Sequence, residues 1–242
     1  MTAPAPASGT IGISDEHVEL HASARRWVAA HVDVAATKAT LDAPLEADTR
    51  PPFWDALRAT GWTGLHIGEK FGGEGYGIAE LAVVLEELGR ACAPGPFLPT
   101  VLTAAVLQAV GTDEQCTRWL PALADGSSIG AIVIPPGPSG FAGRAVGAAA
   151  PEGDGALRLS GSVRPVLGAS IADLLVVPAH VGEPPAGAPL ADAPIVWCVI
   201  ERTAPGVAVT CLPSTDGTRR VGVIDSDRLL PALISHHRQV PA

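Results

Sequence analysis

The sequence predicts an α+β protein, in which an N-terminal all-α helical domain is followed by an antiparallel β-barrel-like domain. In the first half, apolar residues recur at the spacing of helices that each bury one face. Beyond Gly126 the apolar runs shorten to about four to eight residues and are separated by Gly, Pro, Asp and Ser, which is typical of short strands joined by turns. We therefore expect a helical domain over residues 1–125 and a strand-rich domain over residues 126–242.

Five helices are expected in the first half, each with an apolar face or a recognisable cap. They run from Ser14 to Val32, from Pro51 to Gly61, from Ile78 to Leu88, from Leu98 to Val110 and from Asp113 to Ala124. Ser14 is a favourable N-cap, and Gly61 and Gly89 are expected to end the second and third helices.

Six strands are expected in the second half. They cover Ile129–Ile134, Ala156–Val163, Asp173–Ala179, Ile195–Ile200, Gly206–Leu212 and Arg219–Ile224. The segments 151–156 and 214–218 have the composition of turns, and 182–193 has that of an exposed loop. Strands do not alternate with helices here, so a parallel nucleotide-binding sheet is not expected.

Composition and charge exclude several classes of protein. The net charge of −9 and the lack of any basic run argue against binding to nucleic acid. No apolar stretch approaches the roughly 20 residues of a membrane span, and the N-terminus does not resemble a signal peptide. The four cysteines form no paired motif and are expected to be buried, reduced thiols, so a cytoplasmic location is predicted.

Three groups of residues invite a functional hypothesis, and a structural explanation is favoured for each. The glycines of 72–77 imitate a dinucleotide fingerprint but lack the preceding strand, so they are expected to form a turn between closely packed helices. Glu86 and Glu87 are about 100° apart around a helix, so they do not form a two-carboxylate acid–base pair. They are expected instead to lie on a helix face that forms ion pairs. His17 and His21 are one turn apart, but no third metal ligand is evident. These patterns predict no catalytic residue and no metal site.

Several longer segments carry a resemblance to a known family. They are TGWTGLHIGEKFGGEGYGIAELAVVLEELGRACAPGPF (60–97), FWDALRATGW (53–62), QCTRWLPALADG (115–126), GSVRPVLGASIADLLVVPA (161–179) and STDGTRRVGVI (214–224). In this order they resemble the N-terminal helical and central β domains of the acyl-CoA dehydrogenase family. The resemblance covers most of the chain.

The resemblance implies an activity, a substrate and a cofactor. Members of the family remove two hydrogens from the Cα–Cβ bond of an acyl-CoA thioester: a glutamate takes the α proton and FAD takes the β hydrogen as hydride. In the family, that glutamate and much of the FAD contact come from a C-terminal helical domain. The sequence in hand ends where such a domain would begin, so no residue corresponds to the catalytic glutamate.

The resemblance also locates five cofactor-binding positions in the strand-rich half. Ile134 stands where the family has the Thr of a Thr-Glu-Pro-x-x-Gly-Ser-Asp segment; Gly140 falls near the Ser position, with Ser139 one residue away. Pro165 and Leu167 replace the Trp and Thr of a Trp-Ile-Thr segment that walls the flavin. Ile, Leu and Pro side chains donate no hydrogen bonds, so FAD is not expected to be held firmly by this chain alone.

Three functions remain open. The chain is part of a flavin-dependent acyl-CoA dehydrogenase whose third domain lies elsewhere, a non-catalytic partner subunit of a heteromeric acyl-CoA dehydrogenase, or a truncated remnant. In the first two cases it is expected to form a homo- or hetero-oligomer with an acyl-CoA dehydrogenase homologue, because uncovered apolar surface favours association.

Overall fold

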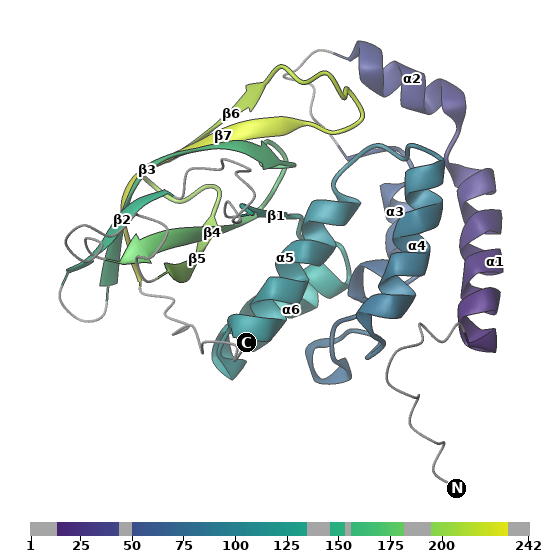
Figure 1. The fold of residues 1–242 in the computed structure, drawn as a ribbon, viewed down its shortest axis with the longest axis horizontal. Helices are drawn as coiled ribbons and strands as arrows, with labels where there is room; N and C mark the ends of the chain where they lie inside the picture. The colour runs from purple at the N-terminus through teal and green to yellow at the C-terminus, as the bar shows by residue number, and fades with distance from the viewer. Residues whose placement is uncertain (1–13, 44–49, 135–145, 153–155, 182–194, 232–242) are drawn as a thin grey trace, which may run out of the picture.

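The computed structural model describes residues 14–43, 50–134, 146–152, 156–181 and 195–231 (Figure 1). The helices are α1 (Asp15–His31), α2 (Val34–Asp42), α3 (Trp54–Arg58), α4 (Ile78–Arg90), α5 (Phe97–Val110) and α6 (Asp113–Ala124), with 3-10 turns η1 (Trp62–Gly64) and η2 (Glu69–Phe71). The strands are β1 (Gly130–Ile132), β2 (Val146–Glu152), β3 (Ala156–Leu167), β4 (Leu174–Val181), β5 (Ile195–Glu201), β6 (Val207–Leu212) and β7 (Val221–Pro231). The α+β class and the order of helices before strands are confirmed.

The predicted helices form close to their expected positions, with three differences. The helix expected from Pro51 to Gly61 is shorter and covers only Trp54–Arg58. Ser14 accepts a hydrogen bond from the backbone of His17 and caps α1 as expected. Gly89 does not end α4, because Arg90 continues the last turn and pairs with carboxylates one turn earlier. The short helix α2 was not expected at all, since most of its described side chains face solvent and its sequence has no apolar stripe.

The sheet needs one correction to the expected antiparallel barrel. Its seven described strands form an open, mixed sheet in the order β1-β4-β2-β3-β7-β6, with β5 on the other side of β4. The β1–β4 and β2–β4 pairings are parallel. The physical reason is the route of the chain: the hairpin of β2 and β3 lies between β1 and β4 in sequence, so β4 returns to the sheet in the direction of β1.

Helix α5 joins the helices to the sheet by a close backbone approach. Gly130 in β1 leaves room for Thr103, whose Cβ lies only 2.6 Å from the position that a Gly130 Cβ would occupy. The amide of Gly130 donates a hydrogen bond of 3.2 Å to Oγ1 of Thr100. Both threonines are fully buried, and α5 lies against the sheet in Figure 1. A single buried apolar cluster therefore continues from the helices into the strands.

Helices α1 and α4 are joined by two histidine–glutamate pairs. Nε2 of His17 lies 2.8 Å from Oε1 of Glu80, and Nε2 of His21 lies 2.9 Å from Oε1 of Glu87. Glu87 is almost fully buried and is also paired with Arg90. The histidines thus contact carboxylates of a neighbouring helix, and the expectation that Glu86 and Glu87 form ion pairs is confirmed.

No helix in the described part of the chain is long and apolar enough to cross a membrane.

Candidate functional site

A bulge in β3 decides where the predicted flavin positions of that strand lie. Val163 pairs with Ile224 and Val166 pairs with Gly222, so β3 has one more residue than β7 between these pairs. An extra residue interrupts the alternation of faces. Both Val163 and Val166 are consequently buried, while the intervening Pro165 is exposed and lies outside the sheet's core.

The other predicted positions are only partly brought together. Ile134 follows β1 and is 68% exposed. Leu167 is half-buried at the end of β3 and lines a cavity. Ser139 and Gly140 lie outside the described residues.

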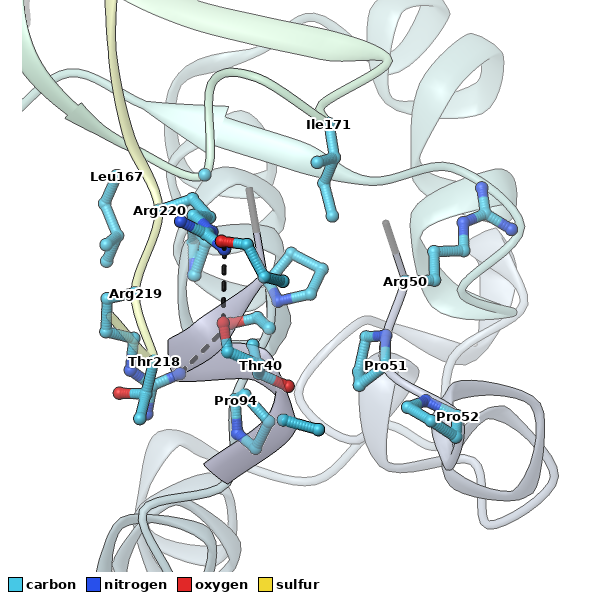
Figure 2. A pocket seen from close by; sticks show the side chains of 16 residues that line it. Thr40, Arg50, Pro51, Pro52, Pro94, Leu167, Ile171, Thr218, Arg219 and Arg220 are labelled. Atoms are coloured by element: carbon cyan, nitrogen blue, oxygen red, sulfur yellow. Dashed lines mark hydrogen bonds between the residues drawn. The ribbon is translucent and has the colours of Figure 1, made fainter. Parts of the chain in front are cut away.

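The cavity beside Leu167 has a volume of about 260 Å³ and lies between segments that are far apart in sequence. Figure 2 shows Leu167, Thr218 and Arg219 on one side of it and Arg50, Pro51 and Pro52 on the other. Its described lining contains five prolines (Pro51, Pro52, Pro94, Pro96 and Pro99) and three arginines (Arg50, Arg219 and Arg220). Prolines have no amide donor, so the wall is poor in backbone hydrogen-bond donors.

Two backbone donors at the cavity, the amides of Gly168 and Gly95, are already used. The amide of Gly168 donates to the carbonyl oxygen of Arg220 at 2.8 Å, and that of Gly95 donates to the carbonyl oxygen of Thr218 at 3.3 Å. Gly168 has a φ of +72°, and a Cβ there would lie 2.9 Å from Cγ of Pro99. This glycine allows β3 to turn close against the start of α5.

Arg220 ties α2 to the rim of the cavity. Its Nη2 donates hydrogen bonds to the carbonyl oxygens of Thr40, at 3.2 Å, and Ala43, at 3.0 Å. These carbonyls lie at the C-terminal end of α2, where a positive charge is favourable. Leu41 adds an apolar contact, since its Cδ2 would lie 2.9 Å from a Cβ on Gly217. Helix α2 is thereby fixed to the loop before β7 (Figure 1).

Arg219 ties the same loop to the segment before α5. Its Nη1 donates to the carbonyl oxygen of Gly95 at 3.0 Å. Burial lowers the pKa of Arg219, and the nearby Asp216 and Cys92 oppose this shift. Arg50 belongs to another group, because its Nη2 donates to the carbonyl oxygen of Ser127 at 2.8 Å and lies 3.6 Å from Asp173.

The described residues do not fit a firmly held flavin. Ile134, Pro165 and Leu167 have no side-chain donor, and only Leu167 reaches the cavity. The cavity is smaller than the roughly 300–1,000 Å³ of sites that enclose a drug-sized ligand, which is itself smaller than FAD.

The other sequence patterns form no site among the described residues. The loop 72–77 follows the 3-10 turn η2 and not a strand, and a Cβ on Gly73 would meet the carbonyl oxygen of Ile67. A close-packed turn is confirmed there. All four cysteines are free, but only Cys116 and Cys198 are buried, so the expectation of burial is wrong for Cys92, which is exposed. No group of three metal-ligating side chains occurs in the part that the structure describes.

Sequence analysis did not find the cavity. Pro94-Gly95-Pro96 and Arg219-Arg220 belong to the segments 60–97 and 214–224, which carry the family resemblance. Both segments were noticed, but nothing local in either indicates that they meet across more than a hundred residues.

Comparison with known proteins identifies the family. The model of the acyl-CoA dehydrogenase N-terminal domain matches residues 14–127. The acyl-CoA dehydrogenase IpdE2 of Mycolicibacterium smegmatis is 38% identical over 125 residues, which cover 51% of this chain and 38% of that protein. The acyl-CoA dehydrogenase FadE28 of Mycobacterium tuberculosis is 32% identical over 196 residues, or 76% of this chain and 50% of that protein. The chain belongs to the acyl-CoA dehydrogenase family.

A solved structure extends the match across both halves of the fold. The ChsE4–ChsE5 complex from Mycobacterium tuberculosis is similar with a TM-score of 0.70 and 25% identity, over 93% of this chain and 57% of that chain. The chain thus spans about half the length of the acyl-CoA dehydrogenases that it matches.

Proposed function

We propose that the chain works within an acyl-CoA dehydrogenase that oxidises the Cα–Cβ bond of an acyl-CoA thioester, and that its own role is that of a non-catalytic partner subunit. The observation that carries this proposal is the absence of side-chain donors at Ile134, Pro165 and Leu167. A polar cofactor edge buried against such residues leaves hydrogen bonds unmade, at a cost of about 1–3 kcal/mol for each buried group.

The geometry beside Leu167 supports the same role. The amides of Gly95 and Gly168 are already bonded to the loop before β7, so they cannot replace the missing side-chain donors without breaking that packing. The similarity to a complex named for two different chains supports a heteromeric assembly. The partner is expected to be a longer homologue that supplies the flavin site and the catalytic base.

A second candidate is a flavoprotein that binds FAD once the rest of the fold is supplied. It is favoured by the match to the ChsE4–ChsE5 complex over 93% of this chain, since the backbone framework of both halves is retained. In that case, backbone contacts and residues outside this chain would hold the cofactor.

Co-expression with a longer acyl-CoA dehydrogenase homologue from the same source distinguishes the two roles. A partner subunit is expected to co-purify with the homologue and to raise its dehydrogenase activity, and the Leu167→Thr variant should leave that activity unchanged. A flavoprotein is expected to show flavin bound in proportion to this chain, and Leu167→Thr should strengthen that binding. Failure to co-purify with any homologue, together with no bound flavin, would contradict both.

A further inference from the structure

The cavity beside Leu167 has an unusual combination of charge and surroundings. Three arginines line it, and its described lining includes neither Asp nor Glu, although the whole chain carries a net charge of −9. The remaining described lining consists of five prolines, Leu167, Ile171, two alanines, two glycines and two threonines. Positive charge is therefore gathered at an otherwise apolar hollow.

Arg219 and Arg220 keep donors that the described residues do not use. Both are half-buried, and both donate only to backbone carbonyl oxygens: Arg219 to Gly95, and Arg220 to Thr40 and Ala43. Neither forms an ion pair within the part of the chain that the structure describes. A guanidinium has more N–H groups than these bonds use.

A half-buried guanidinium that forms no ion pair is incompletely compensated, because burial removes water; Asp216 acts on Arg219 without forming an ion pair with it. The planar N–H edge of arginine matches the oxygens of a carboxylate or a phosphate, and such charge-assisted bonds are stronger than neutral ones. The prolines and aliphatic side chains nearby suit a hydrocarbon group attached to that anion.

We propose that this cavity binds a small amphiphilic anion, with its carboxylate or phosphate at Arg219 and Arg220 and its hydrocarbon part against Leu167, Ile171 and the prolines. The proposal depends on the chain's own cavity and not on the dehydrogenase role, because neither flavin nor thioester is needed for binding.

The test uses three probes with the same alkyl chain: sodium hexanoate, hexanamide and hexyl phosphate. Binding to the full chain is measured by isothermal titration and by the shift in thermal unfolding. Hexanoate or hexyl phosphate should bind at least about tenfold more tightly than hexanamide, since only the anions gain charge-assisted bonds. Whichever of the two anions binds more tightly shows whether the cavity prefers a carboxylate or a phosphate. Equal binding of hexanoate, hexyl phosphate and hexanamide would overturn the proposal.

Two variants test the place of binding. Arg219→Gln removes one positive charge, and Ile171→Trp reduces the volume of the cavity while keeping all three arginines; both should abolish the anion preference. Arg202→Gln changes an exposed arginine outside the cavity lining and should bind as the native chain does. Unchanged affinity in Ile171→Trp would overturn the proposal.

Discussion

Nε1 of Trp54 donates a hydrogen bond of 3.0 Å to the carbonyl oxygen of Gly126, which lies 72 positions later in the chain. Gly126 has a φ of +66°, and a Cβ there would lie 2.7 Å from Cγ of Arg58. Arg58 and Thr63 donate to the neighbouring carbonyls of Asp125 and Ala124. The chain thus passes from α6 to β1 through a turn that the side chains of α3 and η1 hold in place.

Trp54→Phe should lower the free energy of unfolding by about 1–3 kcal/mol, because the buried carbonyl of Gly126 loses its partner. Urea denaturation followed by circular dichroism measures the change. Trp119→Phe is the matched control. Trp119 is half-buried, and its ring N–H makes no hydrogen bond in the described structure. Trp119→Phe should therefore lower the free energy of unfolding by less than Trp54→Phe does. Equal losses would show that aromatic packing, and not this bond, holds the turn.

Arg220→Gln should release α2. The only two lysines of the sequence are Lys38, exposed in α2, and Lys70, paired with Asp113 at 3.0 Å. Two lost hydrogen bonds of about 1 kcal/mol each should speed cleavage at Lys38 by a lysine-specific protease roughly tenfold or more.

The rate of cleavage at Lys70 serves as an internal control and should not change. Arg202→Gln should leave both rates as they are in the native chain. Equal acceleration at both lysines in Arg220→Gln would indicate global unfolding and would contradict a local role for Arg220.

The Glu80 carboxyl should make the stability of the fold depend on pH at values below the ordinary pKa of a glutamate. Its own backbone amide, the amide of Gly77 and the His17 ring lower its pKa from 4.5, against an opposing effect of burial. A carboxyl whose pKa is lowered on folding stabilises the protein above its unfolded pKa, and this stabilisation is lost as the pH falls through the folded pKa. Glu80→Gln should therefore cost about 1 kcal/mol or less at pH 7.

Denaturation of both proteins from pH 7 to pH 3 tests this expectation. The stabilities of Glu80→Gln and the native chain should converge as the pH falls below 4.5. Glu86→Gln, which changes an exposed carboxylate, is the control and should show little pH-dependent difference. A constant gap between Glu80→Gln and the native chain would show that the charge of Glu80 is not responsible.

His66 should destabilise the fold in mild acid. It is buried, and neither ring nitrogen has a hydrogen-bond partner in the described structure. Burial lowers its pKa below 6.5, and the backbone of Val101 opposes the shift without completing a hydrogen bond. The unfolded chain therefore binds a proton more readily than the folded one, so stability falls as the pH drops below 6.5.

His66→Leu should remove that loss and should not lower stability at pH 7, since an apolar side chain of similar size leaves no polar atom unpaired. Thermal unfolding between pH 7.5 and pH 5.5 measures the difference. A His66→Leu variant with the same pH dependence as the native chain would contradict this explanation.

Local patterns were sufficient to predict most of the helices and the order of the two halves. Ser14, the periodic leucines of α4 and the short apolar runs after Gly126 all act over a few residues, so sequence reasoning detects them. The division at residues 125 and 126 stays a prediction, because one buried cluster joins helices and strands.

What sequence reasoning missed depends on long-range contacts. Helix α2 has no apolar stripe and is fixed by Arg220, which lies 180 positions after Thr40. The parallel pairing of β4 with β1 depends on the course of the intervening hairpin. For the candidate site, Leu167 was predicted from family resemblance, whereas the arginines and prolines around it come together only in the folded chain.

The most direct test of the partner-subunit account is the ratio of bound FAD to protein after the purified chain is saturated with FAD and desalted. Far less than one flavin per chain is predicted. One tightly bound flavin per native chain would contradict the account.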